Sequence, residues 1–183
     1  MGILITGLIL FVVLHIVPQT PLKPQLIEQL GRKPYFAAFG TVAIIAVGLV
    51  AWGYSVADYV QLYQPPAWGR HATMLLVLLS FISLASLRSN SHIRRFVRDP
   101  LGVAIFLWGL GHLFVRGDLA SVLLFSVFAL YGLGKLISEV MREPRPDFAV
   151  ITKDDIRSVM TGLLIYAVII FLHPYVIGVP VMF

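Results

Sequence analysis

Residues 119–137 read LASVLLFSVFALYGLGKLI, and this stretch is the clearest indication of the fold class. Its one charged residue, Lys135, stands close to its end. A transmembrane helix needs about 20 mostly apolar residues, because the hydrocarbon core of a bilayer is about 30 Å thick and a helix rises about 1.5 Å per residue. The stretch therefore predicts a helix that spans a membrane.

The chain contains five further apolar runs of similar character. In chain order the six runs are Met1–Val17, Tyr35–Tyr54, Ala72–Leu87, Leu101–Val115, Leu119–Ile137 and Val159–Ile177. The second, fifth and sixth are long enough to span alone, whereas the other three need flanking residues or a locally thin bilayer. The first run lacks a basic start and a small-residue cleavage site, so we interpret it as a retained helix and not as a signal peptide.

The composition agrees with a protein embedded in lipid. Apolar residues make up 58% of the chain and charged residues only 13%, whereas a soluble domain is about 25% charged. The absence of cysteine excludes disulfides, thiolate metal sites and thiol catalysis. The net charge of +5 comes from Lys and Arg in short loops, where they suit contacts with anionic membrane lipid and not a nucleic acid.

The distribution of Lys and Arg predicts the orientation of the helices. Over the seven segments that flank the runs, with Lys135 counted in the loop that follows it, the numbers are 0, 3, 1, 4, 1, 5 and 0. Basic loops favour the cytoplasmic side, so both termini should lie on the outer side. The predicted fold is all-α, a polytopic transmembrane bundle of about six spans in which residues 1–183 form a single domain.

Several local patterns predict where helices begin. Gly117 and Asp118 form a tight turn, so the fourth and fifth runs should be an antiparallel hairpin with Asp118 as a helix N-cap. Asp99 followed by Pro100 is typical of another helix start, and we favour this interpretation over a ligand role. Residues 152–155, read as TKDD, suggest a capping box at the start of the last helix.

Three histidines within the runs are the main candidates for a functional site. His15, His112 and His173 lie in the first, fourth and sixth runs, and polar groups at membrane depth are costly. Imidazole at that depth suits ligation of haem iron, copper, zinc or iron, or proton relay. The alternative is a hydrogen bond to a neighbouring helix or, for His173 before Pro174, a helix end.

Residue types alone leave the metal open. With no cysteine and no carboxylate inside the runs, an all-histidine or bis-histidine site is the natural metal hypothesis. Trp108 lies one turn before His112 on the same helical face. The glycines Gly102, Gly109 and Gly111 could leave room for a haem plane, or they could be helix-packing contacts.

Three groups of residues together resemble the NnrU family of bacterial membrane proteins. They are LHIVP at 14–18 with PL at 21–22 and LGR at 30–32; RDPLG at 98–102, LWGLGHL at 107–113 and GDLAS at 117–121 with LF at 124–125; and LHPYVIG at 172–178. The set covers most of the chain in the family's order. The resemblance implies a multi-pass protein of the bacterial inner (cytoplasmic) membrane, in the context of denitrification and nitrogen-oxide metabolism, so the outer side predicted for both termini is the periplasm.

The family is also similar to the 15-cis-zeta-carotene isomerase of plastids and cyanobacteria, a haem-dependent membrane enzyme. On that likeness His15 and His112 match the positions proposed as axial haem ligands, so the implied cofactor is haem b and a possible substrate is an apolar polyene. Asp99 stands where the family pattern usually has histidine, and the isomerase's candidate cysteine has no counterpart, so neither of those roles transfers.

The sequence therefore leaves three functional hypotheses. The first is a haem-binding protein of nitrogen-oxide or redox metabolism, or a cis–trans isomerase of the carotenoid type. The second is a non-catalytic accessory or assembly subunit that docks on a larger membrane protein complex through its helix faces. The third is a membrane methyltransferase, since residues 98–102 faintly resemble an Arg-His-Pro-Tyr-x-Gly stretch, although the His and Tyr are missing.

Overall fold

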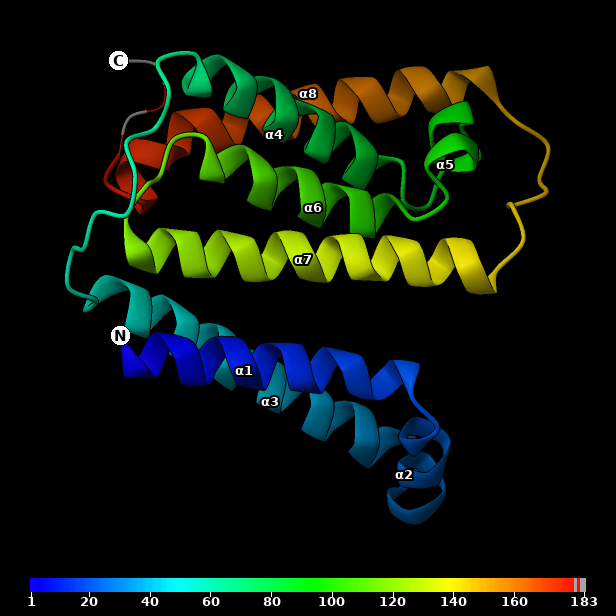
Figure 1. Ribbon diagram of the computed structural model, residues 1–183. Coiled ribbons are helices and arrows are strands. Elements are labelled where there is room, and N and C mark those ends of the chain that lie inside the picture. Colours follow the sequence, from blue (N-terminus) through cyan, green and yellow to red (C-terminus); the bar gives the residue numbers. More distant parts are fainter. Residues whose placement is uncertain (180, 182–183) are drawn as a thin grey trace. The chain divides into compact units, whose positions relative to one another are not determined.

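The structure is a computed structural model that describes residues 1–179 and 181, and over this part of the chain it is all-α (Figure 1). Its elements are α1 (Gly2–Ile16), the short 3-10 helix η1 (Val17–Gln19), α2 (Leu22–Leu30), α3 (Arg32–Ser55), α4 (Gly69–Ala85), α5 (His92–Val97), α6 (Pro100–Leu113), α7 (Leu119–Arg142) and α8 (Thr152–Val176). Each of the six predicted runs forms a helix, namely α1, α3, α4, α6, α7 and α8. The all-α prediction is confirmed.

Four of the described helical segments are long and apolar enough to cross a membrane. They are α1 together with η1, α3, α7 and α8. Helices α4 and α6 are apolar but have only 17 and 14 residues. The 14 residues of α6 cover about 21 Å of a hydrocarbon core of about 30 Å. The chain is thus a membrane protein with four candidate spans, and the count of six stays a prediction.

The chain forms two compact units. The first consists of residues 1–63 and 117–124, and the second of residues 64–116 and the described residues from 125 onward. Helix α7 begins in the first unit and continues in the second.

In the first unit, α1 and α3 pack at very short range because glycines lie where they meet. A Cβ atom on Gly7 would lie 2.7 Å from the backbone nitrogen of Val50, and one on Gly53 would lie 2.2 Å from that of Leu4. Such close approach gives two helices extensive van der Waals contact without the hydrophobic driving force that water provides. Leu4 of α1 and Ala46 of α3 are fully buried.

In the second unit, α4 packs against both α6 and α8. Three hydroxyl groups of α4 donate hydrogen bonds to carbonyl oxygens of α6. They are Thr73 to Gly111 at 2.7 Å, Ser80 to Ala104 at 2.7 Å and Ser83 to Pro100 at 3.0 Å. In an apolar medium such bonds hold neighbouring helices together, because a hydroxyl left without a partner would be costly.

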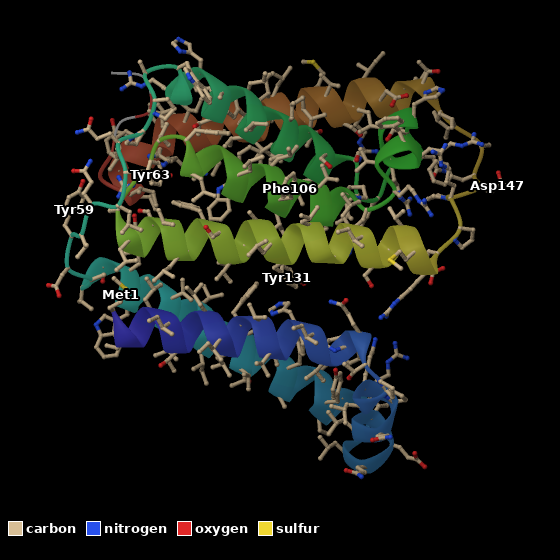
Figure 2. All side chains as sticks on the ribbon, in the orientation of Figure 1. Met1, Tyr59, Tyr63, Phe106, Tyr131 and Asp147 are labelled. Carbon is tan, nitrogen blue, oxygen red and sulfur yellow. The ribbon has the colours of Figure 1, made fainter. Side chains whose placement is uncertain are left out.

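The predicted hairpin of α6 and α7 is confirmed by contacts within the second unit. A Cβ atom on Gly109 would lie 2.8 Å from the backbone nitrogen of Ala129, and one on Gly132 would lie 2.5 Å from that of Phe106, which Figure 2 labels on α6. Asp118 caps α7 as predicted, accepting a hydrogen bond from the Ser121 amide at 3.0 Å.

The glycines of α6 are packing residues and do not leave space for a haem plane. A Cβ atom on Gly102 would lie 3.1 Å from the Gly132 carbonyl oxygen, and one on Gly111 would lie 3.3 Å from the Leu76 side chain. Together with the contact at Gly109, this means that all three positions are filled by neighbouring helices. Of the two interpretations that the sequence leaves open, helix packing is correct.

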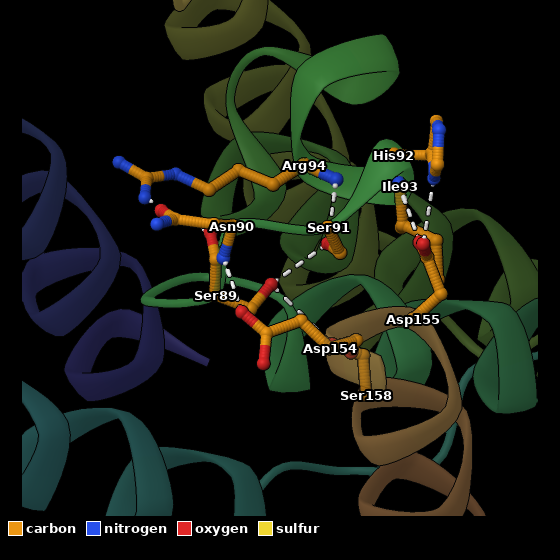
Figure 3. A network of polar contacts seen from close by, with 9 residues as sticks. All are labelled: Ser89, Asn90, Ser91, His92, Ile93, Arg94, Asp154, Asp155 and Ser158. Atoms are coloured by element: carbon orange, nitrogen blue, oxygen red, sulfur yellow. Dashed lines mark hydrogen bonds and ion pairs between the residues drawn. The ribbon is translucent and has the colours of Figure 1, made fainter. Parts of the chain in front are cut away.

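The predicted capping box at residues 152–155 is wrong. The N-cap of α8 is Ile151, which makes no side-chain hydrogen bond. The two acids of the first turn bond to another segment instead (Figure 3): Asp154 accepts from the Asn90 amide at 2.8 Å, and Asp155 contacts the His92 imidazole at 2.8 Å. They therefore fasten the segment around the start of α5 to the start of α8, which a local sequence pattern could not reveal.

We expect the Gly132→Ala substitution to destabilise the protein by about 1–3 kcal/mol, because the new methyl group would clash with the backbone of α6. Gly134→Ala on the same helix is the matched control, since a Cβ there meets nothing within 4 Å and alanine favours a helix. The measurement is the free energy of unfolding in detergent. Equal effects of the two substitutions would contradict the close α6–α7 contact.

Candidate functional site

His15 and His112 share one side-chain arrangement, although they lie in different units. The Nδ1 atom of His15 lies 2.8 Å from the carbonyl oxygen of Phe11, and that of His112 lies 2.8 Å from the carbonyl oxygen of Trp108. A carbonyl oxygen can only accept, so Nδ1 carries the proton in both rings and donates it. In the neutral ring the lone pair is then on Nε2, which is how a metal-binding histidine is oriented by its outer partner.

Aromatic rings surround His15 in the first unit. Its ring stacks on Phe11 at a centroid distance of 4.1 Å, and the edge of Phe39 from α3 lies at 5.5 Å. His15 belongs to the last turn of α1, so its imidazole lies at the end of the α1–α3 pair that is connected through α2.

His112 has an equally aromatic environment in the second unit. Its ring stacks on Phe125 of α7 at 4.5 Å with an interplanar angle of 19°, and the Trp108 ring lies 4.9 Å away. Trp108 also makes an edge contact with Phe125 at 5.1 Å. The predicted neighbourhood of Trp108 and His112 is therefore present, with Trp108 supplying both a ring and the carbonyl that orients the imidazole.

His173 makes a different kind of contact. Its Nδ1 atom lies 2.6 Å from the carbonyl oxygen of Val179, beyond the end of α8. It shares the second unit with His112. Among the described residues no group of three or more His, Cys, Asp or Glu side chains is arranged to hold a metal ion. A haem iron with two axial histidines does not require such a group.

Asp99 is a helix cap and an ion-pair partner. It is only 5% exposed, accepts from the Gly102 amide at 3.1 Å as predicted, and lies 2.7 Å from the ammonium nitrogen of Lys135 on α7. This pair was not predicted from the sequence. The signal was present, because Asp99 and Lys135 are equally distant in sequence from Gly117 at the tip of the hairpin.

Tyr35 is a second residue whose environment was not predicted from the sequence. It lies in the first turn of α3 and is 5% exposed. Its hydroxyl is the one buried side-chain polar atom without a hydrogen-bond partner in the part of the chain that the structure describes. Sequence alone gave no signal for it, because a tyrosine at the end of an apolar run is typical of a membrane interface.

A family model described as NnrU protein matches residues 3–181 of the chain. The chain belongs to the NnrU family. No curated protein and no solved structure matches it. Membership in the NnrU family agrees with the resemblance found in the three groups of residues, which include both His15 and His112.

We expect Lys135→Met to destabilise this NnrU family member by about 3 kcal/mol, because it leaves the buried Asp99 carboxylate without its cation. Adding Asp99→Asn should restore most of the lost stability, since asparagine keeps the helix cap and carries no charge. The measurement is a double-mutant cycle of unfolding free energies in detergent. Simple additivity of the two substitutions would show that the pair is not coupled.

Proposed function

We propose that this chain is a six-span protein of the bacterial inner membrane that binds haem b through His15 and His112, with both termini in the periplasm. The observation that carries the haem proposal is the arrangement that the two imidazoles share. Each donates from Nδ1 to the carbonyl oxygen four residues earlier, so each has Nε2 in the form that binds a metal.

The residues around each histidine fit a haem ligand. The carbonyl oxygens of Phe11 and Trp108 fix the orientation of the two rings. The rings of Phe39 and Phe125 add apolar surface that excludes water. Haem b, when bound through two histidines, would supply an iron that exchanges electrons.

His112 with His173 is the alternative pair, because the two share one unit and lie in the last turns of α6 and α8, which end on the outer side in this topology. His15 lies in the last turn of α1, toward the cytoplasmic side, about 9 Å from the depth of His112 by helix rise, so the pair of His15 and His112 requires tilted helices.

Two kinds of chemistry are compatible with such a site. One is redox chemistry within nitrogen-oxide metabolism, and the other is cis–trans isomerisation of an apolar polyene. The membrane setting supports the second substrate class, because an apolar polyene would reach an aromatic-lined site from the lipid. The family's association with denitrification supports the first.

The six-span topology is supported by the helices against which α4 and α6 pack. Helix α4 packs along α8, and α6 packs along the later part of α7, so each short helix lies beside one of the long candidate spans (Figure 1). Elements packed side by side over their length share one depth in the bilayer. The alternation of basic loops supports the same topology with both termini outside.

Haem binding is tested by expressing the protein with added haem and recording its absorption spectrum in detergent. We expect a Soret band that His15→Ala and His112→Ala each abolish or shift, while His71→Ala, an exposed histidine of α4, leaves it unchanged. Loss of the band in His173→Ala with retention in His15→Ala would identify the alternative pair. The absence of a band in the wild-type protein would contradict haem binding.

The topology is tested with single cysteines, because the chain has none of its own. We expect Gln61→Cys to react with a membrane-impermeant maleimide from the periplasm, and Phe96→Cys and Asp147→Cys to react only after the membrane is opened. Phe96 is 82% exposed between α4 and α6, and Figure 2 labels Asp147 between α7 and α8. If only the four long helices span, Phe96→Cys will react from the periplasm.

An accessory subunit is the second candidate, and one observation favours it. On α3, a Cβ atom at Gly40 or Gly48 would meet nothing within 4 Å, and Ile44 between them is 75% exposed. Small residues on an outward face let a helix of another protein approach closely. Stable purification with one membrane partner and no Soret band, lost in a Gly40→Leu, Gly48→Leu variant, would favour this function over haem binding.

A further inference from the structure

The Tyr35 hydroxyl is a buried donor that lacks an acceptor within the described protein. A buried polar group left without a hydrogen bond is costly, and a buried tyrosine nearly always finds a partner for its hydroxyl. The side chain is only 5% exposed, so bulk water does not readily fill that role. An unmet donor in a site of this kind points to a ligand group that accepts from it.

The position of Tyr35 connects it with His15. Both residues contact Phe39, whose ring centroid lies 6.4 Å from that of Tyr35 and 5.5 Å from that of His15. Tyr35 occupies the first turn of α3 and His15 the last turn of α1, so they lie at the same end of the packed α1–α3 pair. The Tyr35 ring is therefore separated from the first proposed ligand by one aromatic residue, Phe39.

The charges near Tyr35 indicate the chemistry of the missing acceptor. Arg32 and Lys33 begin α3 immediately before it, neither α1 nor α3 contains an Asp or Glu, and α2, which packs on α3, adds one residue of each sign, Lys23 and Glu28. The local field is therefore positive, and it favours an anionic acceptor over a second donor. In the predicted topology this end of α3 is at the cytoplasmic boundary of the membrane, where a carboxylate can stay ionised.

We infer that Tyr35 donates a hydrogen bond to a carboxylate of the ligand that His15 binds. The inference rests on the proposed function, in which the ligand is haem b and the carboxylate is one of its propionates. Tyr35 is then a positioning residue, which fixes the edge of the porphyrin while His15 binds the iron. A lipid phosphate is the competing anionic acceptor at this depth.

The test compares haem release by the wild-type protein, Tyr35→Phe and the control Tyr59→Phe, a loop tyrosine that is 74% exposed. Each protein is loaded with haem b or with haem dimethyl ester, which lacks ionised carboxylates, and release to apomyoglobin is timed. Loss of a hydrogen bond to a charged acceptor raises the dissociation constant by a factor of about 10 or more. We expect Tyr35→Phe to release haem b faster than the wild-type protein by about that factor. For the dimethyl ester, we expect Tyr35→Phe and the wild-type protein to release it at the same rate.

The possible outcomes separate this inference from the proposed function. If the wild-type protein binds haem and Tyr35→Phe releases it at the wild-type rate, the inference is wrong and the proposed function stands. If the wild-type protein binds no haem, both are wrong. If the faster release persists with the dimethyl ester, a propionate is not the acceptor and the inference fails.

Ligand-free protein provides the control for folding and for lipid. Phenylalanine has the shape of tyrosine without the unmet hydroxyl, so ligand-free Tyr35→Phe should unfold at the wild-type temperature or above it. A clearly lower unfolding temperature in detergent free of phospholipid would mean that the protein or water already satisfies the hydroxyl, which overturns the inference. A drop seen only when anionic phospholipid is added back would identify lipid phosphate as the acceptor, with the same consequence.

Discussion

Within lipid a polar group can find its hydrogen-bond partner only in the protein or in a ligand, and this constraint organises the whole molecule. Helices satisfy the hydrogen bonds of their own backbone. Only the polar groups of side chains therefore need partners from elsewhere. The three hydroxyls of α4 take carbonyl oxygens of α6, and glycines allow α6 to approach α7 closely. Packing and hydrogen bonding thus replace the hydrophobic driving force that would assemble the same helices in water.

The same constraint orders the histidines. An imidazole needs an acceptor for its N–H, and the nearest one on a helix is the carbonyl oxygen four residues earlier. His15 and His112 both use it, and the bond that satisfies the ring also determines which nitrogen has the lone pair. The same hydrogen bond therefore satisfies the imidazole N–H within the membrane and leaves Nε2 available to bind a metal. This is why His15 and His112 support the proposed haem site.

How far the sequence predicts this fold depends on the range of each interaction. The six helical runs, the α6–α7 hairpin and the caps at Asp99 and Asp118 follow from local patterns, and the structure agrees with them. The acids of α8 were misinterpreted because their partners, Asn90 and His92, lie more than 60 positions away in sequence. The role of the α6 glycines depended on which helix lies opposite, and only the folded chain answers that.

Hydrogen-bond satisfaction also distinguishes residues that complete the fold from residues that await a ligand. Asp99 occupies a position where the family pattern usually has histidine, which would make it a natural candidate for chemistry. Both of its carboxylate oxygens have partners, however, in the Gly102 amide and the Lys135 ammonium, so the fold alone accounts for it. The Tyr35 hydroxyl has a similar degree of burial and no partner in the described chain. Lipid tails cannot supply one, and this difference from Asp99 is the reason why we assign the acceptor for Tyr35 to a ligand.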